Sequence, residues 1–265
     1  LKQIYDKGLL YEGFKVVPYC PRCGTPLSSH EVAQGYKDVK GKSITAKFKV
    51  KGTDNEYFLA WTTTPWTLPS NVALCVNPRE AYVKISVKVD EKEEKYILAE
   101  ELLSIIPGDY KVEETFIGAD LEYKEYEPLF NYGDFKKKAY YVTCDNFVTL
   151  TDGTGIVHIA PAFGEDDSLI GRTYDLPFLQ LVDDKGEFKE EAIDFAGMFC
   201  KDADEVIMKL LYERGLLFEV LPFEHTYPFC WRCDTPLIYY ARESWFVEMT
   251  NVKDDLVANN DKINW

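Results

Sequence analysis

Four cysteines stand in two C-x-x-C pairs near opposite ends of the chain, Cys20 with Cys23 and Cys230 with Cys233. Four thiolates form the complete ligand set of a tetrahedral Zn²⁺ ion, and such a closed site is structural because no coordination position stays open. The sequence therefore predicts one structural zinc site. Two alternatives stay open. The cysteines could be reduced, buried thiols without a metal, or each pair could be a redox dithiol. A redox pair normally lies at the start of a helix, and the proline three residues after each pair disfavours a helix there.

The cysteine pairs belong to an internal repeat, P-[YF]-C-x-R-C-x-T-P-L, which occupies residues 18–27 and 228–237. If both copies share one ion, they hold the ends of the chain together, as insertion into a loop of another domain requires. We therefore expect a fragment of a longer protein. The remaining cysteines, Cys75, Cys144 and Cys200, are unpaired in sequence and are predicted to pack in the interior of a protein of the reducing cytoplasm.

A threonine-rich segment, W-T-T-T-P-W-T-L-P-S-N at residues 61–71, follows a predicted strand. Its two prolines stop further strand pairing. Its hydroxyls and the freed backbone N–H groups could bind a polyhydroxylated ligand such as a ribose, or an adenine edge. The plainer alternative is a β-branched strand followed by a turn.

A second segment, D-G-T-G-I-V-H-I-A-P-A-F-G-E-D-D at residues 152–167, runs from a glycine turn through an apolar strand to a proline and an acidic cluster. Strand ends that open into loops are common positions for sites. Taken alone, His158 is more typical of a core histidine, and Glu165 to Asp167 of the first turn of a helix. Gly153 and Gly155 are too short a pattern for a phosphate-binding loop.

The elements that must position these segments are mostly strands. The alternation of apolar and polar residues over 44–50 predicts a half-buried strand. Further strands are predicted at 57–61, 72–76, 81–89, 139–143 and 156–159. Helices are predicted at 203–214, with Asp202 and Glu205 as a capping box and Gly215 as its end, at 165–174, and at residues 1–7 before Gly8.

The composition limits the possible partners. The chain has 265 residues with 45 Asp and Glu against 30 Lys and Arg, a net charge of −15. This charge excludes broad electrostatic affinity for nucleic acid, so any RNA contact must be local. With 46% hydrophobic and 15% aromatic residues the chain can form a sizeable core. No apolar run approaches the roughly 18 residues of a membrane span, so no membrane partner is expected.

Together the threonine-rich segment, the G-T-G-I-V-H-I-A-P-A-F-G-E-D-D run and the C-P-R-C and C-W-R-C knuckles resemble isoleucyl-tRNA synthetase over essentially the whole chain. The part that they resemble is the editing domain, the connective polypeptide that interrupts the class I catalytic fold. In the valyl and leucyl relatives the threonine-rich strand continues into Arg-Pro-Glu or Arg-Pro-Asp. This chain has Thr64-Pro65-Trp66-Thr67 instead, which favours the isoleucyl type.

The resemblance implies an α+β fold, mainly β: an editing-domain β-barrel of the valyl/isoleucyl/leucyl-tRNA synthetase type with peripheral helices and a zinc-ribbon stem. Residues 1–40 would form the N-terminal half of the stem, residues 41–222 the editing domain, and residues 223–265 the C-terminal half of the stem and the return to the catalytic domain. The chain lacks the HIGH and KMSKS signatures. ATP and Mg²⁺ are therefore expected only in the catalytic domain of the parent enzyme.

The resemblance also implies an aminoacyl-tRNA ester hydrolase within isoleucine–tRNA ligase. It would remove valine wrongly attached to tRNA(Ile) and so protect translation fidelity, while the parent enzyme attaches isoleucine with ATP. The implied partners are the acceptor end of tRNA(Ile) carrying valine and the rest of the synthetase chain, in a cytoplasmic monomer. The alternative is a non-catalytic zinc-ribbon module that docks tRNA.

The site residues carried over from the resemblance divide into two groups. The catalytic group is Asp167, Thr62 and Thr63, and the substrate-binding group is Thr64, Trp66, Thr67, Asn71 and His158. Asp167 would pair with the α-ammonium of the aminoacyl group, and the threonine strand would hold the terminal adenosine and position water.

Thr64 and His158 would form the walls of a pocket that excludes isoleucine by size. Such a second sieve is needed because one methylene in an apolar pocket gives only about 1–3 kcal/mol, a limit for which isoleucyl-tRNA synthetase is itself the known example. We expect neither a metal nor a covalent intermediate in the hydrolysis, because an aminoacyl ester is already activated.

Overall fold

The computed structural model describes residues 1–89 and 92–264. Asp90, Glu91 and Trp265, the last residue of the expected C-terminal half of the stem, lie outside the described residues. In chain order the elements, with 3-10 helices written η, are α1 (Lys2–Asp6), β1 (Leu10–Cys20), β2 (Thr25–Pro26), α2 (Ser29–Ala33), β3 (Tyr36–Lys49), β4 (Glu56–Thr62), η1 (Pro65–Ser70), β5 (Ala73–Val76), β6 (Ala81–Val89), β7 (Lys92–Ala99), η2 (Glu100–Ile105), β8 (Tyr110–Ile117), η3 (Gly118–Leu121), β9 (Tyr141–Cys144), β10 (Ile156–Ile159), α3 (Glu165–Thr173), α4 (Asp204–Glu213), β11 (Leu217–Pro228), β12 (Ile238–Val247), η4 (Thr250–Val252) and α5 (Lys253–Asn260).

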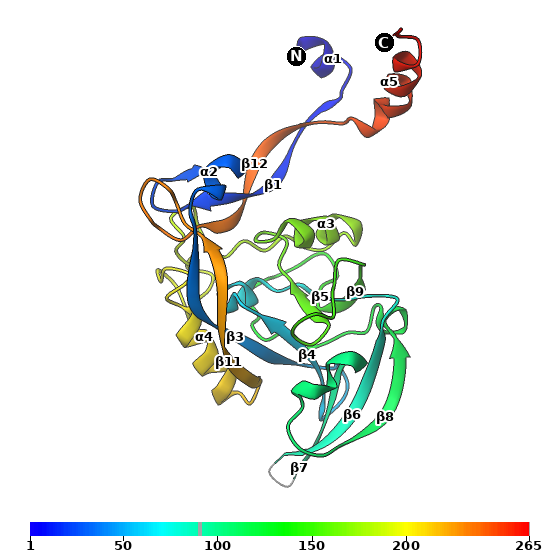
Figure 1. Cartoon of the computed structure of the whole chain (residues 1–265), viewed down its shortest axis with the longest axis vertical. Coiled ribbons are helices and arrows are strands. Elements are labelled where there is room, and N and C mark those ends of the chain that lie inside the picture. The colour runs from blue at the N-terminus through cyan, green and yellow to red at the C-terminus, as the bar shows by residue number, and fades with distance from the viewer. Residues whose placement is uncertain (90–91, 265) are drawn as a thin grey trace.

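The strands form three sheets (Figure 1). The largest has the order β11-β3-β4-β7-β6-β8, in which β4 and β7 are parallel, and a second has the order β10-β5-β9. The third, β12-β1-β2, is the ribbon that leads away from the body. The expected α+β, mainly β fold is confirmed, but the ladders of the described residues do not close into a barrel. Just after β4 ends at Thr62, Pro65 lacks the N–H that a ladder needs and begins η1, and β10 pairs with β5 rather than with the large sheet.

Strand β3 differs from the expected half-buried pattern, because residues on both of its faces are buried. Ile44 and Ala46 are buried against the core that includes α4, as the alternation predicts. Lys47, on the other face, is also 93% hidden from solvent, with 7% relative exposure. It is accommodated because its ammonium lies 2.8 Å from a Glu94 oxygen and over the rings of Tyr57 and Tyr96.

The helices begin and end close to the predicted positions. Gly8 and Gly215 have positive φ just after α1 and α4, as expected for helix ends. The predicted capping box of α4 is wrong, because Ala203 is the N-cap residue and makes no side-chain cap. Asp204 instead turns its carboxylate away from the helix and accepts the Trp66 backbone N–H at 2.8 Å, which ties α4 to η1.

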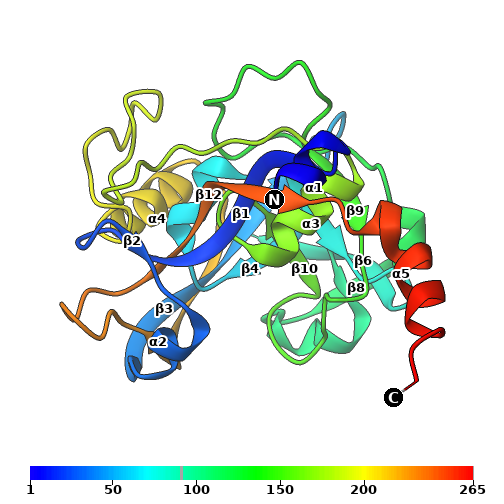
Figure 2. The same cartoon turned by 90° about the horizontal axis from the view of Figure 1, so that it is seen from above.

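The stem is an antiparallel ribbon of β1 and β12, paired from Leu10 with Val247 to Tyr19 with Ile238. Its inner end carries the two cysteine repeats, and its outer end leads to both chain termini (Figure 1). Seen from above, β1 and β12 lie over α3 (Figure 2), and the Ala241 N–H donates to the Ala162 carbonyl at 2.9 Å. Among the described helices, none is long and apolar enough to cross a membrane.

Candidate functional site

A cavity of about 250 Å³ lies where the ends of β4 and β10 meet the start of α3. It is lined by Trp61, Thr62, Thr63, Thr64, Thr67, Phe147, Val157, His158, Ala160, Phe163 and Asp167. Six of the eight site residues expected from the sequence therefore line one cavity. The two segments that carry them are far apart in the chain: Thr67 and His158, which are in contact, are separated by 91 positions.

Threonine hydroxyls form a connected chain along one wall of the cavity. The Thr62 hydroxyl accepts the Thr64 backbone N–H at 3.1 Å, and the hydroxyls of Thr62 and Thr64 lie 3.3 Å apart. The Thr67 hydroxyl lies 3.4 Å from that of Thr64 and donates to the Thr64 carbonyl at 2.8 Å. Pro65 sets this geometry, because its fixed φ starts η1 and brings residue 67 back towards residue 64.

His158 continues the chain, with its Nε2 3.0 Å from the Thr67 hydroxyl. A hydroxyl has one proton to give: when Thr67 donates it to the Thr64 carbonyl, Nε2 donates to the hydroxyl and Nδ1 is unprotonated. Nδ1 is buried and has no hydrogen-bond partner among the described residues. Burial lowers the pKa of His158 to about 4, so the ring is neutral at pH 7.

Asp167 lies in the first turn of α3, where its Oδ1 accepts the Ala160 backbone N–H at 2.7 Å. Its carboxylate folds back against Gly164: a Cβ there would lie 2.1 Å from Asp167 Oδ2, so no larger residue fits without displacing it. Burial raises the pKa of Asp167 to about 6, against the opposing effect of the Ala160 hydrogen bond. At pH 7 the cavity thus holds a partly desolvated negative charge that suits a cationic group of a ligand.

Asn71 and Trp66 do not line this cavity. The Asn71 side chain is buried in the core, where it donates to the Ala73 carbonyl at 2.7 Å and accepts from the Tyr126 hydroxyl at 2.6 Å. Trp66 packs edge-on against Phe163, which separates it from the cavity, with ring centroids 5.0 Å apart. Sequence reasoning missed Phe147 as a lining residue, because nothing in the loop that carries it marks it.

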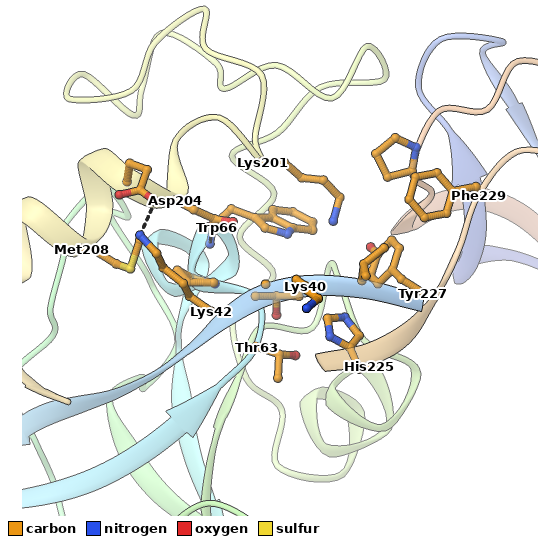
Figure 3. A pocket seen from close by; sticks show the side chains of 16 residues that line it. Lys40, Lys42, Thr63, Trp66, Lys201, Asp204, Met208, His225, Tyr227 and Phe229 are labelled. Carbon is orange, nitrogen blue, oxygen red and sulfur yellow. Dashed lines mark hydrogen bonds and ion pairs between the residues drawn. The ribbon is translucent and has the colours of Figure 1, made fainter. Parts of the chain in front are cut away.

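A groove of about 490 Å³ adjoins the cavity and shares Thr63 and Thr64 with it. Figure 3 shows Trp66, Lys201 and Tyr227 around its common space. No sequence motif marks this groove, because its residues come from β3, the threonine segment and η1, the loop before α4, α4 itself, β11 and the second knuckle.

The four knuckle cysteines form the cluster that the repeat predicts. Their Sγ atoms all lie within 4.8 Å of one another, with Cys23 3.4 Å from Cys233 and 3.9 Å from Cys230. A tetrahedral metal with bonds of about 2.3 Å to sulfur places its ligands about 3.8 Å apart. The cluster can therefore hold a metal ion. Cys75 and Cys200 are buried elsewhere, as expected of packing residues, whereas Cys144 is only partly buried.

Comparison with known proteins places this geometry in context. The family of class I tRNA synthetases (I, L, M and V) matches residues 1–265. The chain is 56% identical over 265 residues to the isoleucine–tRNA ligase of Clostridium acetobutylicum and 55% identical over 266 residues to that of Clostridium novyi. Both matches cover 100% of this chain and 25% of the relative, so the chain spans a quarter of the length of these curated relatives.

Solved structures share the fold at low identity. The editing domain of P. knowlesi cytosolic leucyl-tRNA synthetase matches with a TM-score of 0.51 at 13% identity, over 70% of this chain and 98% of that one. The P. falciparum cytosolic leucyl-tRNA synthetase editing domain with deletions of insertions 1 and 3 matches with a TM-score of 0.53 at 12% identity, over 68% and 99%. The body of this chain therefore has the fold of these domains.

Proposed function

Because this chain belongs to the class I tRNA synthetases and has an editing-domain fold, we propose that it is the editing part of an isoleucine–tRNA ligase. In this role it hydrolyses the ester between valine and the acceptor end of tRNA(Ile). The observation that carries the proposal is the Asp167 carboxylate, held by the Ala160 N–H in a cavity walled by threonine hydroxyls.

Asp167 selects an aminoacyl ester over other esters. A free α-ammonium next to a partly desolvated carboxylate forms a charge-assisted bond, which is stronger than a neutral one and fixes the position of the adjacent ester carbonyl. Peptidyl or acetylated esters lack that ammonium and are not held.

The hydroxyls of Thr62 and Thr63 position the attacking water and the terminal ribose. The oxygen of water adds to the ester carbonyl carbon, the bond from that carbon to the ribose oxygen breaks, and the proton of the water passes to the ribose oxygen. The products are free valine and a tRNA end with its hydroxyl restored. The threonine chain, fixed by Thr67 and His158, needs no rearrangement for this step.

Size exclusion determines which amino acid is removed. The neutral His158 ring, with Thr64 beside it, forms the wall against which the amino-acid side chain lies. Valine fits this pocket, whereas the additional methylene of isoleucine meets a ring that its hydrogen bond to Thr67 holds in place.

The remaining parts of the proposal concern the whole enzyme. The four cysteines hold one Zn²⁺ that has a structural role, because four protein ligands leave no position for substrate. Residues 1–40 and 223–265 form the stem and residues 41–222 the editing domain. ATP and Mg²⁺ are used by the remaining three quarters of a monomeric, cytoplasmic synthetase, which also supplies most contacts to tRNA(Ile).

Deacylation of matched valyl- and isoleucyl-esterified tRNA(Ile) tests the proposal, with this chain and with the full-length synthetase. We expect loss of valine only, abolished by Asp167→Ala and retained by Asp166→Ala, which changes the exposed neighbouring carboxylate. If the full-length enzyme with Asp167→Ala clears valine at the parent rate, the assignment of the site is wrong. If neither protein hydrolyses either ester but both bind tRNA, the docking-module alternative holds.

A further inference from the structure

We propose that the stem ribbon holds the Asp167 carboxylate in its working position, and that Gln180 is the positioning residue through which it does so. This inference rests on the proposed function and adds what fixes Asp167 from outside the cavity. The connection between β10 and α3, residues 160–164, lies between the cavity and the ribbon. One of its backbone groups bonds to Asp167, and another bonds to β12.

This connection is a tight, buried turn. The Ala160 N–H donates to Asp167 Oδ1 at 2.7 Å. The Phe163 N–H closes the turn on the Ala160 carbonyl at 2.9 Å, and the Ala162 carbonyl is left to accept the N–H of Ala241 in β12 at 2.9 Å. Because Ala160 and Ala162 are at most 1% exposed, close packing leaves the turn no free space in which to shift. A displacement of Ala241 therefore moves the turn, and with it the donor that Asp167 needs.

Gln180 fixes Ala241 from the other side of α3. Its Nε2 donates to the Ala241 carbonyl at 3.0 Å. Ala241 is paired with Val16 in the ribbon, yet its N–H and its carbonyl both bond to the body. Ala162 precedes α3 and Gln180 follows it, so one residue of β12 joins the two loops at the ends of this helix. Gln180 contributes through its side chain and the alanines through their backbones, so Gln180 is the link that a substitution can remove.

Aromatic side chains support the same contact. Phe14 of β1 stacks on Phe178 with ring centroids 4.7 Å apart, and the Tyr240 hydroxyl donates to the Val182 carbonyl at 3.3 Å. The segment after α3 is thus fastened to the ribbon on both sides of residue 180. The Tyr240 ring also lies 6.5 Å from the ring of Phe163, which lines the cavity. The rate of hydrolysis then depends on how the ribbon lies on α3 (Figure 2).

Amide hydrogen exchange of a ¹⁵N-alanine-labelled chain, followed by NMR, tests the proposal, because the two backbone donors of this pathway are both alanines. Gln180→Met keeps the length of the side chain and removes its N–H donor. It should speed exchange at Ala241 and Ala160 by about three- to ten-fold, the effect of one lost hydrogen bond. Ala46 and Ala60, which are paired in the large sheet, should exchange as in the parent chain and so report any general loss of stability.

Deacylation provides the second readout. Gln180→Met should lower kcat/KM for the valyl ester about ten-fold. It should also reduce the preference for the valyl over the N-acetylvalyl ester, because that preference depends on where the Asp167 carboxylate lies. Gln180→Lys keeps an N–H donor and should retain both properties of the parent chain. Gln34→Met is the matched control, since Gln34 is exposed and bonds locally to the His30 carbonyl of α2, and it should change neither property.

Three results would overturn the proposal. They are exchange and hydrolysis by Gln180→Met equal to those of Gln34→Met, faster exchange at Ala241 without any change at Ala160, and exchange that rises equally at Ala60. The proposed function can fail separately. If the parent chain hydrolyses neither ester while Gln180→Met still frees the Ala160 amide, hydrolysis is refuted and the positioning of the carboxylate stands.

Discussion

At the residue scale, two neighbouring residues determine where the Asp167 carboxylate lies. The Ala160 N–H fixes one oxygen, and the absence of a side chain at Gly164 leaves space for the other. Gly164 is not needed for a left-handed conformation, because its φ is −141°. The glycine is needed for the space that it leaves.

Gly164→Ala should therefore reduce deacylation by about 100-fold, since a displacement of the order of 1 Å at a reacting group has that effect. The measurement is a double-mutant cycle with Asp167→Ala under single-turnover conditions. If Gly164 acts through Asp167, then adding Gly164→Ala to Asp167→Ala has no further effect on the rate. Additive losses would show that Gly164 has a separate role.

The raised pKa of Asp167 makes a prediction for stability. Its carboxyl has a pKa of about 6 in the folded chain and about 3.9 when unfolded, so the unfolded state ionises first as the pH rises. The folded state therefore loses stability between about pH 4 and pH 6, and the loss is constant above that range. Asp167→Asn should raise the free energy of unfolding at pH 8 by about 3 kcal/mol and leave it unchanged at pH 4, as measured by urea unfolding. A stabilisation that is equal at both pH values would contradict this account.

The sequence was informative about the site to an unequal degree. Thr62, Thr64, His158 and Asp167 could be named because each lies in a recognisable run, and the structure brings them together. Asn71 lies in the same run, yet its amide is used inside the core, which no local pattern reveals. The groove could not be predicted, since its residues become neighbours through the pairing of β3 with β11 and the packing of η1 and α4 beside them.

At the element scale, α4 shows why local motifs can mislead. Asp202 and Glu205 have the spacing of a capping box, but Asp204 provides the contact that matters, to the backbone of η1. Strand positions were predictable because β4, β6 and β10 have apolar runs of their own. Pairing was not, because the parallel contact of β4 with β7 and the separate sheet around β5 depend on tertiary packing.

Asp204→Ala should destabilise the fold by about 1–3 kcal/mol, because it leaves the Trp66 N–H without its acceptor. The stabilities should be compared at pH 6. Burial raises the pKa of Asp204 to about 7, so at pH 6 its carboxyl is mostly neutral, and the alanine variant gains nothing from removing a buried charge. Asp204→Asn should keep most of the stability. Asp202→Ala, at an exposed residue of the supposed capping box, should change the midpoint of urea unfolding little. If Asp202→Ala lowers the free energy of unfolding more than Asp204→Ala does, the capping-box interpretation is supported after all.

At the scale of the whole molecule, the chain consists of a body with a large core and a stem with a small one. The small core lies at the knuckles and contains Cys20, Leu27, Val32, Cys230 and Leu237. The ribbon itself packs on the body, because Val16, Tyr19, Ile238, Tyr240 and Ala241 of β1 and β12 belong to the large core. The five side chains of the small core bury too little apolar surface to hold a fold alone, so the metal should supply much of the stability of the knuckles. The body, with strands buried on both faces, should not depend on it.

Metal removal should therefore unfold the knuckles and spare the body. Purified chain should contain one zinc per molecule, and chelation should expose four thiols to titration while Cys75 and Cys200 stay protected. Hydrogen exchange followed by mass spectrometry should then show lost protection in residues 18–27 and 228–237, with β4, β6 and β7 unchanged. Cys23→Ser should reproduce the effect without a chelator, and Cys144→Ser, outside the cluster, should not. If each metal-free cysteine pair rapidly forms a disulfide, redox chemistry is favoured instead. If hydrogen exchange rises equally in the knuckles and the body, the two cores fold as one unit.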